Sequence, residues 1–97
     1  MPIRVVISKS DNKGKKLQAV FYEGDKRIKT TNFGSEGMSD YTKNKDPKRK
    51  ELYLDRHRKN ENWQDYMSRG SLSRYILWNL PSLSASISDY KKRFGLI

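Results

Sequence analysis

Hydrophobic and polar residues alternate along the first third of the chain. In residues 3–9 and 16–22 every second side chain on one face is apolar, which is typical of strands with one buried face. These faces consist of Ile3, Val5 and Ile7, and of Leu17, Ala19 and Phe21. Residues 27–33 are rich in β-branched side chains, and Gly24 with Asp25 has the composition of a two-residue hairpin turn. The pattern predicts that residues 1–33 form an antiparallel three-stranded meander.

The alternation stops after residue 33, and residues 34–45 are expected to form a loop or a short helical turn because of their two glycines and the Ser39–Asp40 pair. Asp46 and Pro47 then predict the start of a helix. An aspartate side chain accepts hydrogen bonds from free backbone amides, and proline loses nothing at the first helical position. This helix is expected to run to about Lys59.

Two further helices are predicted in the last third of the chain. One begins near Ser71 and ends before Pro81, because proline disfavours helical geometry in the residue that precedes it. The other begins at Ser82 and ends at Gly95, a natural helix C-cap. Its apolar stripe follows helical spacing and consists of Leu83, Ile87, Tyr90 and Phe94. We expect one α+β domain over residues 1–97, with about three short helices, within residues 46–95, packed on the meander.

The composition predicts a small hydrophobic core and a strongly basic surface. Hydrophobic residues make up 34% of the 97-residue chain, but eleven aromatic residues favour a compact fold over disorder. The net charge is +10, which makes a polyanion the first candidate for a partner. The chain has no cysteine and no apolar run long enough to span a bilayer. We therefore expect a soluble protein that is not secreted and has no membrane partner.

Catalytic and ligand-binding motifs find little support in the sequence. His57 is the single histidine, and a metal-dependent nuclease usually needs several converging His or carboxylate ligands. His57 is instead expected to be a partly exposed helix histidine near phosphate or packed on an aromatic ring. The glycines at 34 and 37 lack the lysine that completes a phosphate-binding loop. We expect no enzyme activity, no cofactor, no metal site and no small-molecule substrate.

The predicted helix over residues 47–59 differs from the other two, because it has no apolar stripe. It places Arg49, Leu52, Tyr53 and Arg56 on one arc, and basic residues occur on more than one face. One interpretation is a helix stabilised by internal salt bridges to Glu51 and Asp55. The other is a helix that follows phosphates, with an aromatic residue available to stack or wedge.

The candidate DNA-contacting residues come from this helix and from neighbouring basic clusters. We expect Trp78 to be core, whereas Trp63 could either hold its loop to the core or project outward. Asparagine and glutamine are not grouped on one recognition face, so sequence-tolerant binding is expected. The candidates are Lys15, Lys16, Lys48, Arg49, Lys50, Tyr53, Arg56, Arg58, Lys59, Trp63, Arg69 and Arg74.

A resemblance to a known family extends over roughly residues 33–95. The segments FGSEGMSDYT, KDPKRKELYLDRHRKNENW, GSLSRYILWN and SLSASISDYKKRFG occur in this order. Together they resemble a family of small basic proteins of large DNA viruses of amoebae and algae. Some members of that family are proposed to condense DNA in the virion and are likened to the monomeric chromatin protein of archaea. The resemblance implies an architectural role, and a location in the virion and in the virus factory, in the cytoplasm or nucleus of the host cell.

The first functional hypothesis is therefore a protein that binds double-stranded DNA without sequence specificity and bends or condenses viral DNA through phosphate contacts. The alternative is a virion interaction module, such as a minor capsid or inner-shell component, whose basic face binds acidic protein. Binding to RNA is a weaker third hypothesis, and a preference for single strands would distinguish it.

Overall fold

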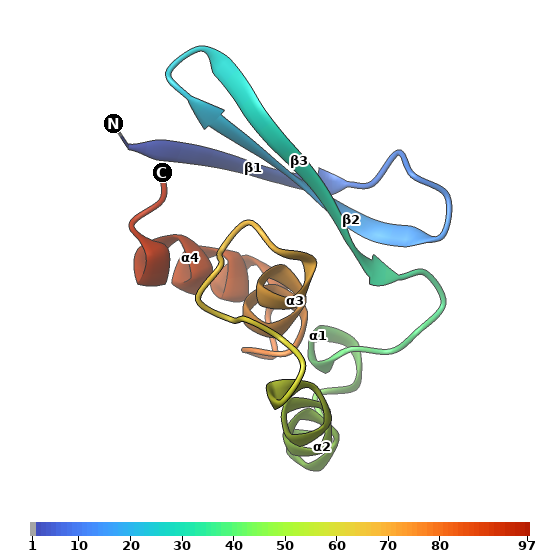
Figure 1. Cartoon of the computed structure of the whole chain (residues 1–97). Helices are drawn as coiled ribbons and strands as arrows, with labels where there is room; N and C mark the ends of the chain where they lie inside the picture. Colours follow the sequence, from blue (N-terminus) through green and yellow to red (C-terminus); the bar gives the residue numbers. More distant parts are fainter. Residues whose placement is uncertain (1) are drawn as a thin grey trace.

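The computed structural model describes residues 2–97 and has an α+β fold, with a three-stranded antiparallel sheet followed by short helices (Figure 1). The strand order is β1-β2-β3, and the second strand pairs with both neighbours. This arrangement confirms the predicted meander and fold class. Met1, which the prediction includes in the meander, lies outside the described residues. The elements are β1 (Ile3–Lys9), β2 (Lys15–Glu23), β3 (Lys26–Ser35), α1 (Tyr41–Asn44), α2 (Pro47–Arg58), α3 (Arg69–Leu72), the π-helix η1 (Ser73–Leu77) and α4 (Leu83–Phe94).

Two predicted boundaries were wrong, and one open alternative is resolved. Strand β3 continues to Ser35, because Ser35 still pairs with Lys15 of β2. Residues 34–45 contain a short helical turn as well as loop, since α1 begins after Asp40, whose side chain caps it. The second predicted helix starts at Arg69, two residues before the predicted start at Ser71, because Ser68 caps it. It continues as a π-helix from Ser73. Each difference depends on a local backbone pairing or on a side-chain cap, which hydrophobic periodicity does not report.

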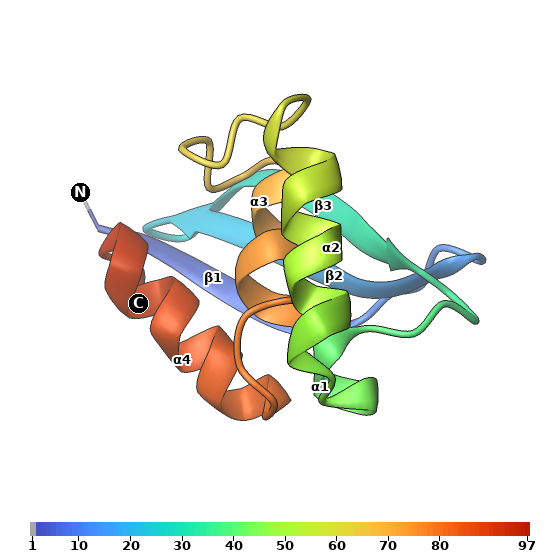
Figure 2. The same cartoon turned by 90° about the horizontal axis from the view of Figure 1, so that it is seen from below.

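The core lies between one face of the sheet and the layer formed by α3, η1 and α4 (Figures 1 and 2). Each strand contributes buried apolar residues to that face, and the helices contribute theirs from the other side. Helix α2 lies outside this layer, across α3 (Figure 2). The core residues are Val5, Ala19, Phe21, Phe33, Leu72, Ile76, Leu77, Tyr90 and Leu96.

Helix α4 follows its predicted caps but not all of its predicted stripe. Ser82 accepts a hydrogen bond from the Ala85 amide at 3.3 Å, and Gly95 takes the left-handed conformation at φ 65°. Tyr90 is fully buried, whereas Leu83, the first residue of the stripe, stays exposed. Beyond the helix, Ile97 pairs with β1, so the end of the chain covers the outer edge of that strand.

Gly34 stands at a close approach between β3 and η1. Its φ is +78°, and a Cβ there would lie 2.7 Å from Leu77 Cδ1. We expect Gly34→Ala to lower the free energy of unfolding by about 2–4 kcal/mol, because strain at positive φ adds to overpacking. Gly37→Ala is the matched control, since Gly37 has φ +86° but nothing within 4 Å of a Cβ. Urea unfolding of both variants measures the difference, and equal losses would show that the Leu77 contact is unimportant.

Candidate nucleic-acid interface

The basic helix α2 begins and ends as the sequence predicts. The Asp46 side chain accepts hydrogen bonds from the amides of Lys48, at 3.0 Å, and Arg49, at 3.4 Å, and Pro47 is the first helical residue. Basic residues fill the last turn, where the helix dipole favours cations. None of the twelve residues is buried, so burial alone does not hold this helix against the protein.

The inner face of α2 is fixed by stacking and by one partly buried ammonium group. Tyr53 stacks on Trp78 with ring centroids 4.5 Å apart and on His57 at 4.2 Å. Burial raises the pKa of Tyr53 to about 12. Lys50 Nζ donates to the Asn79 carbonyl at 2.6 Å and lies 5.1 Å from the centre of the Tyr41 ring. Tyr53 therefore belongs with Lys50 and His57, and not on the arc of Arg49 and Arg56 where the sequence analysis placed it.

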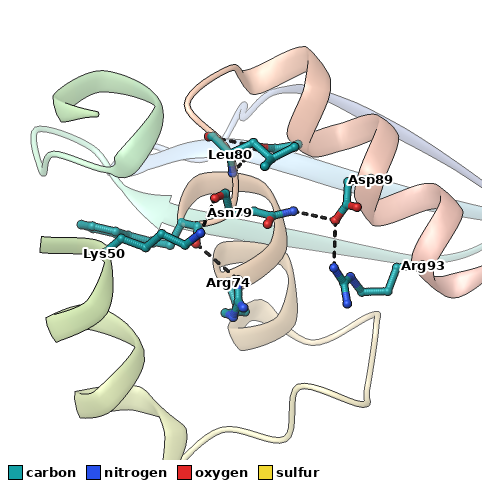
Figure 3. A network of polar contacts seen from close by, with 8 residues as sticks. Lys50, Arg74, Asn79, Leu80, Asp89 and Arg93 are labelled. Atoms are coloured by element: carbon teal, nitrogen blue, oxygen red, sulfur yellow. Dashed lines mark hydrogen bonds and ion pairs between the residues drawn. The ribbon is translucent and has the colours of Figure 1, made fainter. Parts of the chain in front are cut away.

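A polar network connects this inner face to α4 (Figure 3). The Asn79 carbonyl accepts the hydrogen bond from Lys50, and the Asn79 side-chain amide donates a hydrogen bond to Asp89 at 2.6 Å. Arg93 also donates to Asp89, at 3.3 Å. The hydrogen bond from Asn79 lowers the pKa of Asp89, with a further contribution from Arg93. Sequence reasoning did not single out Asn79 or Asp89. The only local signal is the position of Asn79 two residues before Pro81.

The outer face of α2 presents cations around one apolar side chain. Arg49 and Arg56 are exposed on either side of Leu52, which is 58% exposed. Residues 43–59 hold eight Lys or Arg residues and three acids, a net of +5 and half of the chain's net charge of +10. The helix thus turns its stacking residues and Lys50 inward, and its other cations outward.

Internal ion pairs account for little of this charge. Arg58 lies 3.6 Å from Asp55, and both side chains are more than 60% exposed. Exposed pairs of this kind contribute about 0.3–0.5 kcal/mol in helices. Glu51 forms no salt bridge within residues 2–97. The interpretation of α2 as a helix stabilised by salt bridges therefore explains one of its acids and leaves most of its cations unpaired.

The two candidate lysines of β2 differ in their surroundings. Lys15 is half-buried and forms no salt bridge within residues 2–97. Lys16 Nζ lies 2.6 Å from Asp40 Oδ2, and the two side chains are 12% and 2% exposed. Asp40 Oδ1 also accepts hydrogen bonds from the Thr42 amide and hydroxyl. The charge of Lys16 is therefore neutralised inside the protein.

Trp63 and Arg74 form a second inward-facing pair. The Arg74 guanidinium lies 5.4 Å from the centre of the Trp63 ring and 4.8 Å from that of Tyr75. It donates to the Trp78 carbonyl at 3.3 Å, and burial lowers its pKa. The indole N–H of Trp63 is shielded from solvent. Trp63 thus holds its loop to the protein and does not project as a wedge.

Arg69 is an exposed residue at the start of α3. Its Nε donates to the Asn32 carbonyl of β3 at 3.3 Å, which leaves the rest of the guanidinium at the surface. Lys48, Arg49, Arg56, Arg58 and Lys59 are exposed as well. The structure thus separates the candidates into an exposed set and a set engaged in internal contacts, which comprises Lys16, Lys50, Tyr53, Trp63 and Arg74.

A cleft of ≈ 770 Å³ separates α2 from β3. Its lining includes Lys29 and Asn32 on β3, Arg56 on α2 and Arg69 on α3. The cleft adds cations from the strand to the cations of the helix. Sequence reasoning missed Lys29, because it lies in the predicted strand, far from the basic clusters in the sequence.

The single histidine does not gather metal ligands. His57 Nδ1 lies 3.6 Å from Glu61 Oε1, and His57 packs on Tyr53, as one of the two interpretations of the sequence expects. Among residues 2–97 no group of three or more His, Cys, Asp or Glu side chains could hold a metal ion. None of the described helices combines the length and the apolar character that crossing a bilayer requires.

Comparison with known proteins gives one match. A family model described as a family of unknown function (DUF5754) matches residues 5–57, from β1 to the last turn of α2. No match is found among curated proteins or among solved structures. The matched residues include most of β1, all of β2 and β3, and all but the last residue of the basic helix. Of these elements, β2, β3 and α2 contribute residues to the lining of the cleft. Because the match covers more than half of the chain, this protein belongs to the family of unknown function DUF5754.

Proposed function

We propose that this protein binds double-stranded DNA without sequence specificity, through the outer face of α2. The observation that carries the proposal is the two-sided character of this helix. Lys50, Tyr53 and His57 hold it to the protein, while the opposite face leaves its cations exposed. Lysine and arginine at a rigid surface are what phosphate contacts require. The proposed contact set consists of exposed cations of α2 and its two flanks, with Lys45 at the end of α1 just before the helix and Lys59 at its C-cap. The set is Lys45, Lys48, Arg49, Arg56, Arg58 and Lys59.

The side chains of this face support binding to phosphates over the reading of bases. Asparagine and glutamine are the residues that recognise adenine, and α2 contains neither. Arginine can recognise guanine, but α2 also presents lysine beside its arginines, which is suited to sequence-independent phosphate contacts. The expected behaviour is binding that depends on salt and tolerates sequence.

We further propose that the protein bends or condenses the DNA. Architectural proteins often insert an apolar side chain between base steps. Tyr53 and Trp63 are packed against the protein, so they are poor wedges. Leu52 is exposed between the two arginines and takes that role in this proposal.

The biological setting is proposed on the resemblance to the viral proteins alone. In that setting the protein compacts genomic DNA in the virion and in the virus factory. It acts as a structural component and not as an enzyme. The second candidate function, a virion module that binds acidic protein, is favoured by the cations that line the cleft between α2 and β3.

A salt series with a random-sequence duplex tests the proposal. If six cations contact phosphates, the logarithm of affinity falls with the logarithm of salt at a slope of about −5. We expect a slope of about −4 or steeper, and weaker binding to single-stranded DNA and RNA measured alongside. Micromolar protein that gives no retardation of the duplex at low salt would refute duplex binding. A preference for single strands would favour an RNA-binding role.

A further inference from the structure

The two edges of the sheet differ in whether another segment of the chain pairs with them. On the outer edge of β1, the Val5 amide donates to the Ile97 carbonyl at 2.9 Å and the Ile97 amide donates to the Ile3 carbonyl at 3.0 Å. The chain thus covers this edge with its own C-terminus. Strand β3, with ten residues, forms the other edge. Exposed edges offer unpaired backbone groups to any extended chain, so an uncovered edge is unusual unless it is used.

The register identifies the backbone groups that face outward from β3. Ile3 and Val5 face the C-terminus, so Arg4 and Val6 face β2. Their partners on β2 are the even-numbered Tyr22 and Val20, so Ala19 and Phe21 face β3. In β3 the partners of these two residues are Thr31 and Lys29. The N–H and C=O groups of Thr30 and Asn32 therefore point away from the sheet.

The hydrogen bonds of Asn32 agree with this assignment. Its carbonyl accepts a bond from Arg69 Nε at 3.3 Å, which comes from outside the sheet. Within residues 2–97 no backbone group of another segment bonds to Thr30 or Asn32 on that side. On this side the backbone groups of Thr30 thus have no backbone partner within residues 2–97, and the Asn32 carbonyl is covered by the Arg69 side chain.

This edge forms one wall of the ≈ 770 Å³ cleft. The opposite wall is α2, with Arg56 and the stacked Tyr53. Five lysines and arginines line the cleft against two acids, Asp40 and Glu61. Lys16 pairs with Asp40, and the other four cations form no salt bridges within residues 2–97; they are Lys15, Lys29, Arg56 and Arg69. The cleft therefore has an excess of positive charge beside an open strand edge.

We propose that this cleft binds an extended acidic peptide, which adds to β3 as a fourth strand. Backbone bonds to Thr30 and Asn32 would provide affinity, and carboxylates at alternate positions would meet Lys29, Arg56 and Arg69. A carboxylate is also a stronger acceptor for Arg69 than the Asn32 carbonyl. A second copy of the chain fits poorly, because two β3 edges would bring Lys26, Arg27 and Lys29 against the same cations.

Hydrogen exchange at single amides tests the peptide site. The probes are blocked heptapeptides of alternating glutamate and valine, the same peptide with glutamine for glutamate, and the acidic peptide with N-methylated valines. Saturation with the acidic peptide is expected to slow exchange of the Thr30 and Asn32 amides at least about tenfold. The amides of Thr31 and Phe33 already face β2 and are the internal controls. The glutamine and N-methylated peptides are expected to leave all four unchanged.

Matched variants distinguish binding in the cleft from attraction to the overall positive charge of the protein. Lys29→Gln with Arg69→Gln is expected to weaken binding of the acidic peptide about tenfold. Lys26→Gln with Arg27→Gln removes the same charge at the β2–β3 hairpin and is expected to leave binding unchanged. Failure of the acidic peptide to protect Thr30 and Asn32 overturns the proposal. Protection that rises with protein concentration alone would assign the edge to a second copy. Because no DNA is present, the result is independent of the proposed duplex binding.

Discussion

Replacing Arg49 and Arg56 with glutamate is expected to lower the affinity for duplex DNA by about 10²-fold at about 50 mM salt. Both side chains are exposed on the outer face of α2, and neither forms a salt bridge within residues 2–97. Each phosphate contact contributes about 0.9 to the salt slope, so the slope of the double variant should be shallower by about 2. Fluorescence anisotropy with a labelled duplex across a salt series measures both quantities.

The matched control changes the same charge elsewhere. Lys26→Glu with Arg27→Glu alters two exposed cations on β3, next to the β2–β3 turn and outside α2. Its effect should stay within about threefold, because it acts only through long-range attraction. Equal losses in the two double variants would contradict an interface on α2 and would assign binding to net charge. Circular dichroism of both variants establishes that the loss is not one of folding.

Local sequence patterns predict the regular elements of this fold well. Alternation places Val5, Ala19 and Phe21 on the buried face of the sheet. The Gly24–Asp25 turn separates β2 and β3, and the caps at Asp46 and Ser82 begin helices as predicted. These predictions are correct because each depends on residues close together in the chain, such as a side chain and an amide two or three positions away.

The position of α2 on the protein could not be predicted in the same way. Its inner face consists of Tyr53, His57 and Lys50, which have no apolar periodicity. Their partners Trp78 and Asn79 lie more than twenty residues further along the chain. A ring stack and a partly buried ammonium group leave no hydrophobic stripe, so the sequence identified a basic helix without showing which side faces outward.

The candidate cations show the same limit. Charge counting treats Lys15 and Lys16 alike, yet one is half-buried without a salt bridge and the other is neutralised by Asp40. Lys29, on the other hand, faces the cleft and was not a candidate. The use of a lysine depends on what the fold places beside its ammonium group, and that partner is usually distant in sequence.

Lys16→Met is expected to lower the free energy of unfolding by about 3–5 kcal/mol, because it leaves the Asp40 carboxylate buried without its cation. Asp40 is 2% exposed and also caps α1, so it cannot turn to solvent without disturbing that helix. A domain of this size has about 5–15 kcal/mol of stability, so the loss should be large in urea unfolding. Lys16→Met with Asp40→Asn should recover part of the loss, since asparagine keeps the cap and removes the charge.

Lys15→Met is the control for the change of side chain. Lys15 adjoins Lys16 in β2 and forms no salt bridge within residues 2–97, so the cost should be within about 0.5 kcal/mol. The same variants separate two roles for Lys16. An internal ion pair predicts lost stability, with duplex affinity retained where the variant remains folded. A phosphate contact predicts the reverse. If Lys16→Met is as stable as Lys15→Met and binds DNA more weakly, Lys16 belongs to the interface and its pairing with Asp40 contributes little.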